Sequence, residues 1–133
     1  MAKSGSPPKV ILAPAAQDDM REALKWSEEK FGERAAWRYK ALLKQALRDI
    51  QADPERPGSR ERPELAAGLR AYHLQFSRNR VRTPPGIVSN PRHFVIYRRH
   101  ERTAIEVVRI LHDARELNCH LPKLGLGSEV GED

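Results

Sequence analysis

Two apolar segments near the C-terminal end of the chain predict the centre of the fold. Residues 94–97 and 104–111 are rich in Val and Ile and contain neither Gly nor Pro, and a polar segment at residues 99–103 separates them. Unbroken runs of this composition are typical of strands inside a sheet, and the polar segment is typical of a turn. The pattern predicts a β-hairpin, which needs a third strand and a covering helix to be stable.

The N-terminal half of the chain predicts a short strand followed by two helices. An apolar run at residues 10–12 predicts the strand. Apolar side chains then recur at helical spacing over residues 16–31 and again over residues 36–50. Gly32 separates the two patterns and Pro54 follows the second, as expected at helix ends. The two helices are predicted to form an antiparallel helical hairpin.

The middle of the chain predicts one further strand between irregular segments. Residues 54–68 contain several Pro and Gly residues and predict an exposed connector. Apolar and polar side chains alternate over residues 72–76, which predicts a strand with one buried face. Residues 77–92 include Pro-Pro-Gly and a further Pro, and predict an irregular loop.

The order of these elements is β-α-α-β-β-β, which predicts an α+β fold. We expect a small, mainly antiparallel sheet with the helical hairpin packed on one face. A length of 133 residues suits a single domain, which we place at residues 9–122. Residues 1–8 are expected to be disordered, and the Gly-rich, acidic residues 123–133 are expected to form a flexible tail.

Positive charge is concentrated in one segment. The chain carries a net charge of +6, and seven arginines with one acid between residues 78 and 102 equal that whole excess, since seven minus one is six. These arginines are Arg78, Arg80, Arg82, Arg92, Arg98, Arg99 and Arg102. One interpretation is a solvated loop; we favour a docking surface for an anion-rich partner, because guanidinium groups bind phosphate and carboxylate bidentately.

Other features restrict the classes of function. Cys119 is the only cysteine, so neither an internal disulfide nor a Cys-based zinc site is available, and we expect no metal and no cofactor. No apolar run approaches the roughly 18 residues that cross a bilayer, and the N-terminus lacks the apolar core of a signal peptide. We therefore expect a cytoplasmic protein without membrane contact. Trp26 and Trp37 lie off the apolar stripes of their helices, where they either cover one another or are exposed for a partner.

Three segments carry a resemblance to a known toxin superfamily. They are Gly-Leu-Arg at residues 68–70, Phe-Val-Ile-Tyr-Arg at residues 94–98, and residues 105–117, which contain Arg109-Ile110-Leu111-His112 followed by Arg115. With the β-α-α-β-β-β order, they resemble the ParE/RelE superfamily, and most closely its ParE branch, over roughly residues 10–122. The long loop at residues 77–92 departs from that pattern.

This resemblance implies the toxin of a type II toxin–antitoxin system, held inactive by a cognate acidic, ParD-like antitoxin in a hetero-oligomer. ParE-like toxins inhibit DNA gyrase and block replication, and such systems stabilise plasmids. The residues expected to bind the target or the antitoxin are Arg78, Arg80, Arg82, Arg98, Arg99, Arg109 and Arg115.

RelE-like relatives cleave messenger RNA on the ribosome, which is the alternative function. A metal-independent ribonuclease needs a base, a cationic group beside the phosphate and an acid. His112 is the candidate acid, and Arg98 and Arg109 are the candidate phosphate ligands. The base is missing unless Glu106 or His93 serves, because no Lys lies between residues 44 and 123. We therefore expect no catalytic residues. A small nucleic-acid-binding module ranks last, because no helix carries basic residues along one face.

Overall fold

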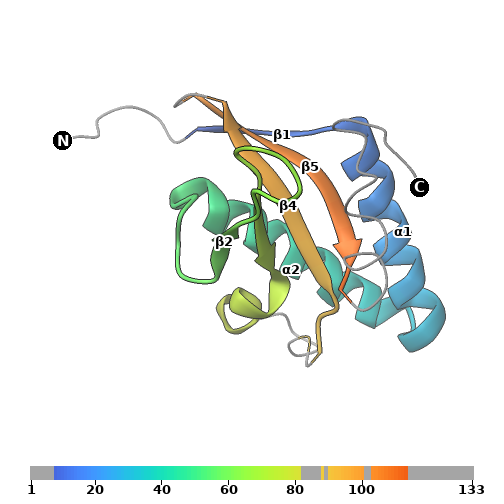
Figure 1. Cartoon of the computed structure of the whole chain (residues 1–133). Coiled ribbons are helices and arrows are strands. Elements are labelled where there is room, and N and C mark those ends of the chain that lie inside the picture. Colours follow the sequence, from blue (N-terminus) through green and yellow to red (C-terminus); the bar gives the residue numbers. More distant parts are fainter. Residues whose placement is uncertain (1–7, 82–87, 89, 101–102, 114–133) are drawn as a thin grey trace.

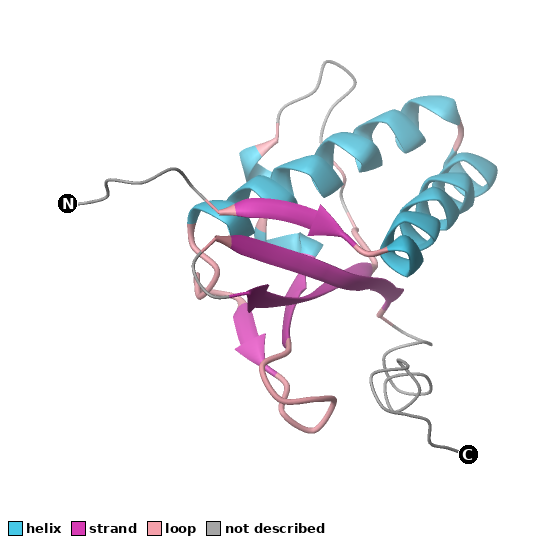
Figure 2. Ribbon diagram, turned by 90° about the horizontal axis from the view of Figure 1, so that it is seen from above, coloured by secondary structure: helices cyan, strands magenta, loops and turns pink. Residues whose placement is uncertain are grey.

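The computed structural model describes residues 8–81, 88, 90–100 and 103–113, which form two α-helices and a five-stranded sheet. In chain order the elements are β1 (Lys9–Leu12), α1 (Pro14–Phe31), α2 (Glu33–Ala52), β2 (Ser59–Glu61), β3 (Arg70–His73), two 3₁₀ turns, η1 (Leu74–Phe76) and η2 (Arg78–Arg80), β4 (His93–His100) and β5 (Ala104–His112). The helices pack together on one face of the sheet (Figure 1, Figure 2). The predicted α+β architecture is confirmed. The segments expected to be disordered fall outside the described residues, apart from Pro8.

The helical hairpin turns at a single glycine. Gly32 follows α1 and precedes α2 with φ at 99°, a left-handed conformation that a residue with a Cβ rarely adopts. Its N–H donates to the carbonyl of Glu28 at 2.8 Å and so closes the last turn of α1. The stripe that α2 turns toward the sheet consists of Tyr39, Leu42, Leu43, Ala46 and Ile50, all buried. The turn and the stripe together confirm the predicted hairpin.

The sheet is built around the β4–β5 hairpin. Strand order is β1-β5-β4-β3-β2, so β4 and β5 occupy inner positions. Ile96 is fully buried and Val108 is 7% exposed, in agreement with the apolar runs that predict these strands. The register shifts by one residue because Val108 has no partner between the pairs Ile96–Arg109 and Tyr97–Val107, which is a β-bulge. β1 pairs with β5 in parallel, and the other three pairings are antiparallel.

Two sequence interpretations of the middle segment were wrong. The strand expected over residues 72–76 ends at His73, and a 3₁₀ turn follows because the His73 imidazole accepts a hydrogen bond from the Gln75 backbone N–H at 3.0 Å. Phe76 is consequently 48% exposed instead of facing the core. The connector expected over residues 54–68 contains β2, whose polar sequence Ser-Arg-Glu pairs with β3 as an edge strand.

The face of the sheet opposite the helices is also partly covered. A second apolar cluster lies there, separate from the core beneath the helices, and it consists of Leu69, Ala71, Ile96, Val108 and Leu111. Leu65 and Ala66, from the turn that precedes β3, pack against it. The helical hairpin thus covers one face as predicted, and this smaller cluster covers part of the other.

Candidate functional site

Five of the arginines that the sequence analysis singled out lie against carboxylates. The N–O distances are 2.9 Å for Arg80–Asp49, 3.0 Å for Arg92–Asp113, 3.0 Å for Arg98–Glu106, 3.5 Å for Arg99–Glu55 and 2.7 Å for Arg109–Asp19. Their side chains range from 25% exposed at Arg109 to 55% exposed at Arg80. A partner that binds these guanidinium groups must therefore displace an internal carboxylate or share it.

The remaining arginines of the proposed set give less information. Arg78 belongs to η2, next to Arg80 on the same 3₁₀ turn. Arg82 and Arg115 lie outside the described residues, as does Arg102. The role of the whole set in binding a target or an antitoxin stays a prediction.

Two of the carboxylates that hold these arginines, Glu106 and Asp113, are stabilised in their ionised form. Hydrogen bonds from His100 and Arg98 lower the pKa of Glu106. Burial raises the pKa of Asp113, but hydrogen bonds from His73 and Arg92 outweigh burial and leave it below its ordinary value. Glu106 is thus poorly suited to act as a general base, because its carboxylate already binds two donors.

An aromatic cluster joins the helices to the ends of β4 and β5. The Trp26 ring lies edge-on to Tyr39, His93 and His112, with ring centroids 5.8, 5.4 and 5.6 Å away. The two imidazoles are 5.3 Å apart, because His93 and His112 are paired across the strands. Trp26 is therefore covered by other aromatic residues, whereas Trp37 is 56% exposed.

Hydrogen bonds within this cluster fix the protonation of His93. The Arg92 backbone N–H donates to the Tyr39 hydroxyl at 2.8 Å, so the hydroxyl directs its own proton to His93 Nδ1 at 2.7 Å. Burial lowers the pKa of His93 to about 3, and the neighbouring His112 adds to this effect. Burial also raises the pKa of Tyr39 well above its usual range. His93 is consequently neutral near pH 7, and its Nδ1 is occupied.

The structure does not bring the three candidate nuclease residues to one point. Arg98 is paired with Glu106 in the register, whereas Arg109 lies opposite Ile96, three residues farther along β5 and about 10 Å away at the usual rise per residue. His112 and Arg109 do line a common cavity of about 440 Å³, together with Asp18, Asp19 and Glu22. Three carboxylates in that cavity oppose the binding of an anionic phosphate.

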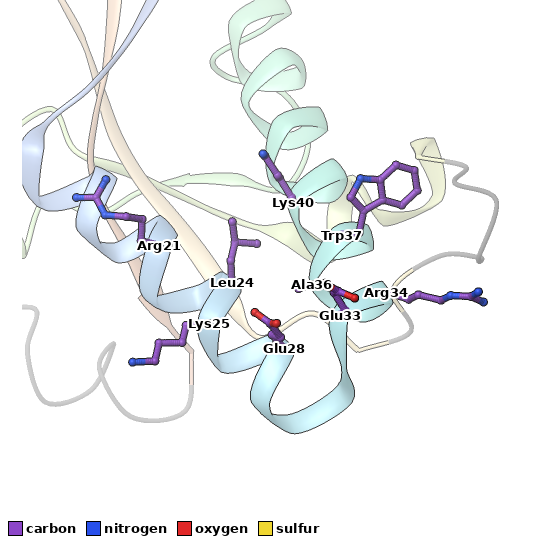
Figure 3. Close-up of a pocket in the computed structure, with 9 residues that line it drawn as sticks. All are labelled: Arg21, Leu24, Lys25, Glu28, Glu33, Arg34, Ala36, Trp37 and Lys40. Carbon is purple, nitrogen blue, oxygen red and sulfur yellow. The ribbon is translucent and has the colours of Figure 1, made fainter.

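A larger hollow lies between the two helices. It has a volume of about 980 Å³ and is lined by Arg21, Leu24, Lys25, Glu28, Glu33, Arg34, Ala36, Trp37 and Lys40 (Figure 3). We call it the hairpin groove. Sequence reasoning did not find this surface, although the position of Trp37 off the apolar stripe of its helix was a signal of it.

The described part of the chain contains neither a metal-binding cluster nor a membrane-spanning helix. No group of three or more His, Cys, Asp or Glu side chains in this part of the chain has a geometry that suits a metal ion. Among the described helices, none combines the length and the apolar character that a membrane span requires.

Comparison with known proteins identifies the family. The family model described as the ParE toxin of type II toxin–antitoxin systems, parDE, matches residues 10–117. The match spans the sheet and both helices and includes Arg98, Arg109 and His112. No curated protein matches the chain. From the extent of the family match, together with the confirmed β-hairpin and helical hairpin, the chain belongs to the ParE toxin family of type II toxin–antitoxin systems.

Proposed function

We propose that this protein inhibits DNA gyrase by binding it, and that a cognate acidic antitoxin neutralises the protein in a hetero-oligomer. Membership of the ParE family supports a toxin with an antitoxin partner. Gyrase as the target follows the behaviour of ParE toxins in general, and such action would take place in the cytoplasm.

The observation that carries this proposal is the separation of the candidate nuclease groups. Arg98 is bound to Glu106 of β5 at 3.0 Å, whereas Arg109 is bound to Asp19 of α1 at 2.7 Å. His93, whose imidazole lies 5.3 Å from that of His112, is buried and accepts a hydrogen bond from the Tyr39 hydroxyl. A ribonuclease must place its acid, base and cationic groups around one phosphate, whereas Arg98 lies apart from the cavity that His112 and Arg109 share with three carboxylates. Inhibition by binding requires no such set.

Partly exposed arginines also suit an acidic antitoxin. Arg80, Arg98 and Arg99 have side chains that are 55%, 37% and 42% exposed, so an incoming carboxylate can reach them. Exchange of one carboxylate for another keeps the guanidinium satisfied, and its cost is therefore small. We propose that the contact residues for the antitoxin or the target are Arg78, Arg80, Arg82, Arg98, Arg99, Arg109 and Arg115.

Two assays run side by side test the proposed mechanism. Purified protein is added to a gyrase supercoiling reaction and to a translation reaction in which messenger RNA cleavage is mapped. We expect loss of supercoiling with intact messenger RNA, and we expect the His112→Ala variant to retain the inhibition. Cleavage at ribosomal A-site codons that His112→Ala abolishes would overturn the proposal in favour of a ribonuclease.

A further inference from the structure

The exposed surface of α2 carries only positive charge. No Asp or Glu lies between Glu33 and Asp49, and α1, by contrast, carries five acidic and three basic residues. The basic residues of this interval, which we call the basic face of α2, are Arg34, Arg38, Lys40, Lys44 and Arg48. All of them are exposed except the half-buried Arg38. The expectation that no helix carries basic residues along one face was therefore wrong.

The charges of the basic face are not neutralised within the fold. In the described part of the chain its first four residues form no ion pair, and Arg48 donates only to the Gln45 amide oxygen, at 3.3 Å. Figure 3 shows the Arg34 side chain directed away from α1. Lys40, Lys44 and Arg48 follow one another at intervals of four residues, where like charges are neighbours on the helix surface and destabilise it. Folding gains nothing from such a row, which indicates an anionic partner.

The basic face has a narrow centre with positive charge on both sides. At about 100° of rotation per residue, Ala41 and Gln45 form a ridge along the middle of the exposed surface of α2. Lys44 and Arg48 lie on one flank of this ridge, and Arg38 lies on the other. The ridge itself consists of a small side chain and an uncharged one. Two rows of cations with a slim ridge between them suit a groove whose two walls are negatively charged.

Arg80 of η2 extends the second flank. Its guanidinium binds the buried Asp49 at 2.9 Å, yet its side chain is 55% exposed. The Gln45 amide nitrogen donates to the same Asp49 carboxylate at 2.9 Å, and the Gln45 amide oxygen accepts from Arg48. A chain of hydrogen bonds therefore holds Arg48 and Arg80 on opposite sides of Gln45.

We propose that the basic face of α2, extended by Arg80, binds the phosphate backbone of duplex DNA. The ridge enters the major groove, where Lys44 and Arg48 contact phosphates of one wall, and Arg38 and Arg80 contact phosphates of the other. This contact with nucleic acid goes beyond the proposed inhibition of gyrase and does not require gyrase.

The shape of the ridge favours DNA over duplex RNA. The major groove of B-form DNA is about 12 Å wide and admits an α-helix, whereas that of A-form RNA is deep and too narrow for side chains to read. The binding should be independent of base sequence. Gln45, the polar side chain on the ridge, is already held by Asp49 and Arg48, so its amide is not available to read a base edge.

A protein or a membrane fits this surface less well. Protein interfaces are centred on aromatic or large apolar anchors and are depleted of lysine, whereas the ridge presents Ala41 and Gln45. Trp37, the exposed aromatic residue of α2, lines the hairpin groove together with Arg34 and Lys40, but Lys44 does not. A helix that binds a membrane surface inserts its apolar stripe, and the apolar stripe of α2 is buried against the sheet.

The test measures the fluorescence anisotropy of a labelled duplex of about 20 base pairs, or two helical turns, as the full-length chain is added at several salt concentrations. The double variant Lys44→Gln, Arg48→Gln removes two charges from one flank. Lys25→Gln, Lys30→Gln is the matched control, because it removes the same charge from exposed positions of α1. Thermal melting checks the folding of both variants, and the loss of like-charged neighbours should not lower the melting temperature of the first.

We expect the logarithm of the wild-type association constant to fall with the logarithm of salt concentration at a slope of about −3 to −4, as four phosphate contacts imply. The Lys44→Gln, Arg48→Gln variant should reduce this slope by about 2 and weaken binding about 50-fold at about 0.1 M salt. The control should change the affinity less than about threefold, and so should a duplex of unrelated base sequence.

Each contrary result identifies a different error. If the control weakens binding as much as the Lys44→Gln, Arg48→Gln variant, net charge explains the binding and the assignment to α2 is overturned. If the wild-type chain does not bind the duplex at low salt, DNA is not its partner. Tighter binding to duplex RNA of the same length, or to phosphatidylserine vesicles, would identify another partner and overturn the proposal. The reaction contains no gyrase, so none of these results bears on gyrase inhibition.

Discussion

Asp19 of α1 holds Arg109 of β5 at the point where β5 loses its neighbouring strand. Arg109 donates to the two carboxylate oxygens at 2.7 and 3.1 Å, and the Ile110 backbone N–H donates to the same carboxylate at 2.9 Å. The pairing of β1 with β5 ends at Val107, so this carboxylate replaces a strand as the hydrogen-bond partner of the exposed edge.

The Asp19 contact gives the first prediction. Asp19→Ala removes the carboxylate that accepts from the Ile110 backbone N–H and binds the partly buried Arg109 guanidinium, and should lower the free energy of unfolding by about 1–3 kcal/mol. Asp18→Ala is the matched control, because the Asp18–Arg21 pair is exposed, and it should change stability by less than about 0.5 kcal/mol. Chemical denaturation measures both. Equal losses of unfolding free energy in the two variants would show that Asp19 does not stabilise the edge of β5.

Asp49 gives the second prediction. Its buried carboxylate accepts hydrogen bonds from Ser77 at 2.6 Å, Arg80 at 2.9 Å and Gln45 at 2.9 Å, and so ties the 3₁₀ turns to α2. Asp49→Ala should cost about 2–3 kcal/mol of unfolding free energy, because the Ser77 hydroxyl is buried and loses its acceptor. Arg80→Ala should cost less, since the Arg80 side chain is 55% exposed. A larger loss of unfolding free energy for Arg80→Ala than for Asp49→Ala, measured by urea denaturation, would contradict this prediction.

The third prediction concerns the central strands. Ile96 is fully buried on β4, so Ile96→Ala should lower the free energy of unfolding by about 2–5 kcal/mol through lost burial and a cavity. Ile11→Ala provides a control in β1, because Ile11 is 44% exposed, and should cost less than about 1 kcal/mol. Comparable shifts in melting temperature for the two variants would mean that Ile96 does not support the core.

The fourth prediction concerns pH. His93 has a pKa of about 3 in the folded chain, compared with an ordinary value near 6.5, so it stays neutral where the unfolded chain takes up a proton. This contribution to stability is complete above about pH 6.5 and is lost as the pH falls toward 3, by about 1.4 kcal/mol per pH unit. The folded and unfolded chains should therefore differ most in proton uptake between about pH 6 and 4.

A replacement series isolates this effect. We expect the free energy of unfolding of the wild-type chain to fall between pH 7 and pH 5, and His93→Gln to remove most of that slope. His100→Gln, at a 49%-exposed side chain, should retain it. Measurements above about pH 5 avoid the titration of carboxylates such as Asp113, whose pKa is lowered in the fold. An unchanged slope in His93→Gln would assign the pH dependence to another group.

Much of the fold could be predicted from local patterns, but the charge pairs could not. The apolar runs around Val95 and Val108 and the helical spacing along α2 locate the main elements, because burial alone dictates those patterns. β2 was missed because Ser59, Arg60 and Glu61 form an edge strand without an apolar face.

The arginine contacts lie beyond any local signal. Arg109 and Asp19 are 90 residues apart in the chain, and Arg80 and Asp49 are 31 apart. The run of arginines in the sequence indicated a concentrated cationic surface, whereas folding places four of its members, Arg80, Arg92, Arg98 and Arg99, against carboxylates from several elements. The hairpin groove was missed for a similar reason, since it requires the relative placement of two helices.

The pairing of β1 with β5 has a consequence for the order in which the protein is made. β1 begins at Lys9, but its partner strand begins at Ala104, so the sheet stays incomplete on the ribosome until almost the whole described chain has been synthesised. The hairpin of α1 and α2 depends on contacts between neighbouring segments and is complete at Ala52. We therefore expect the nascent chain to display its helical surface well before it can assemble a finished sheet.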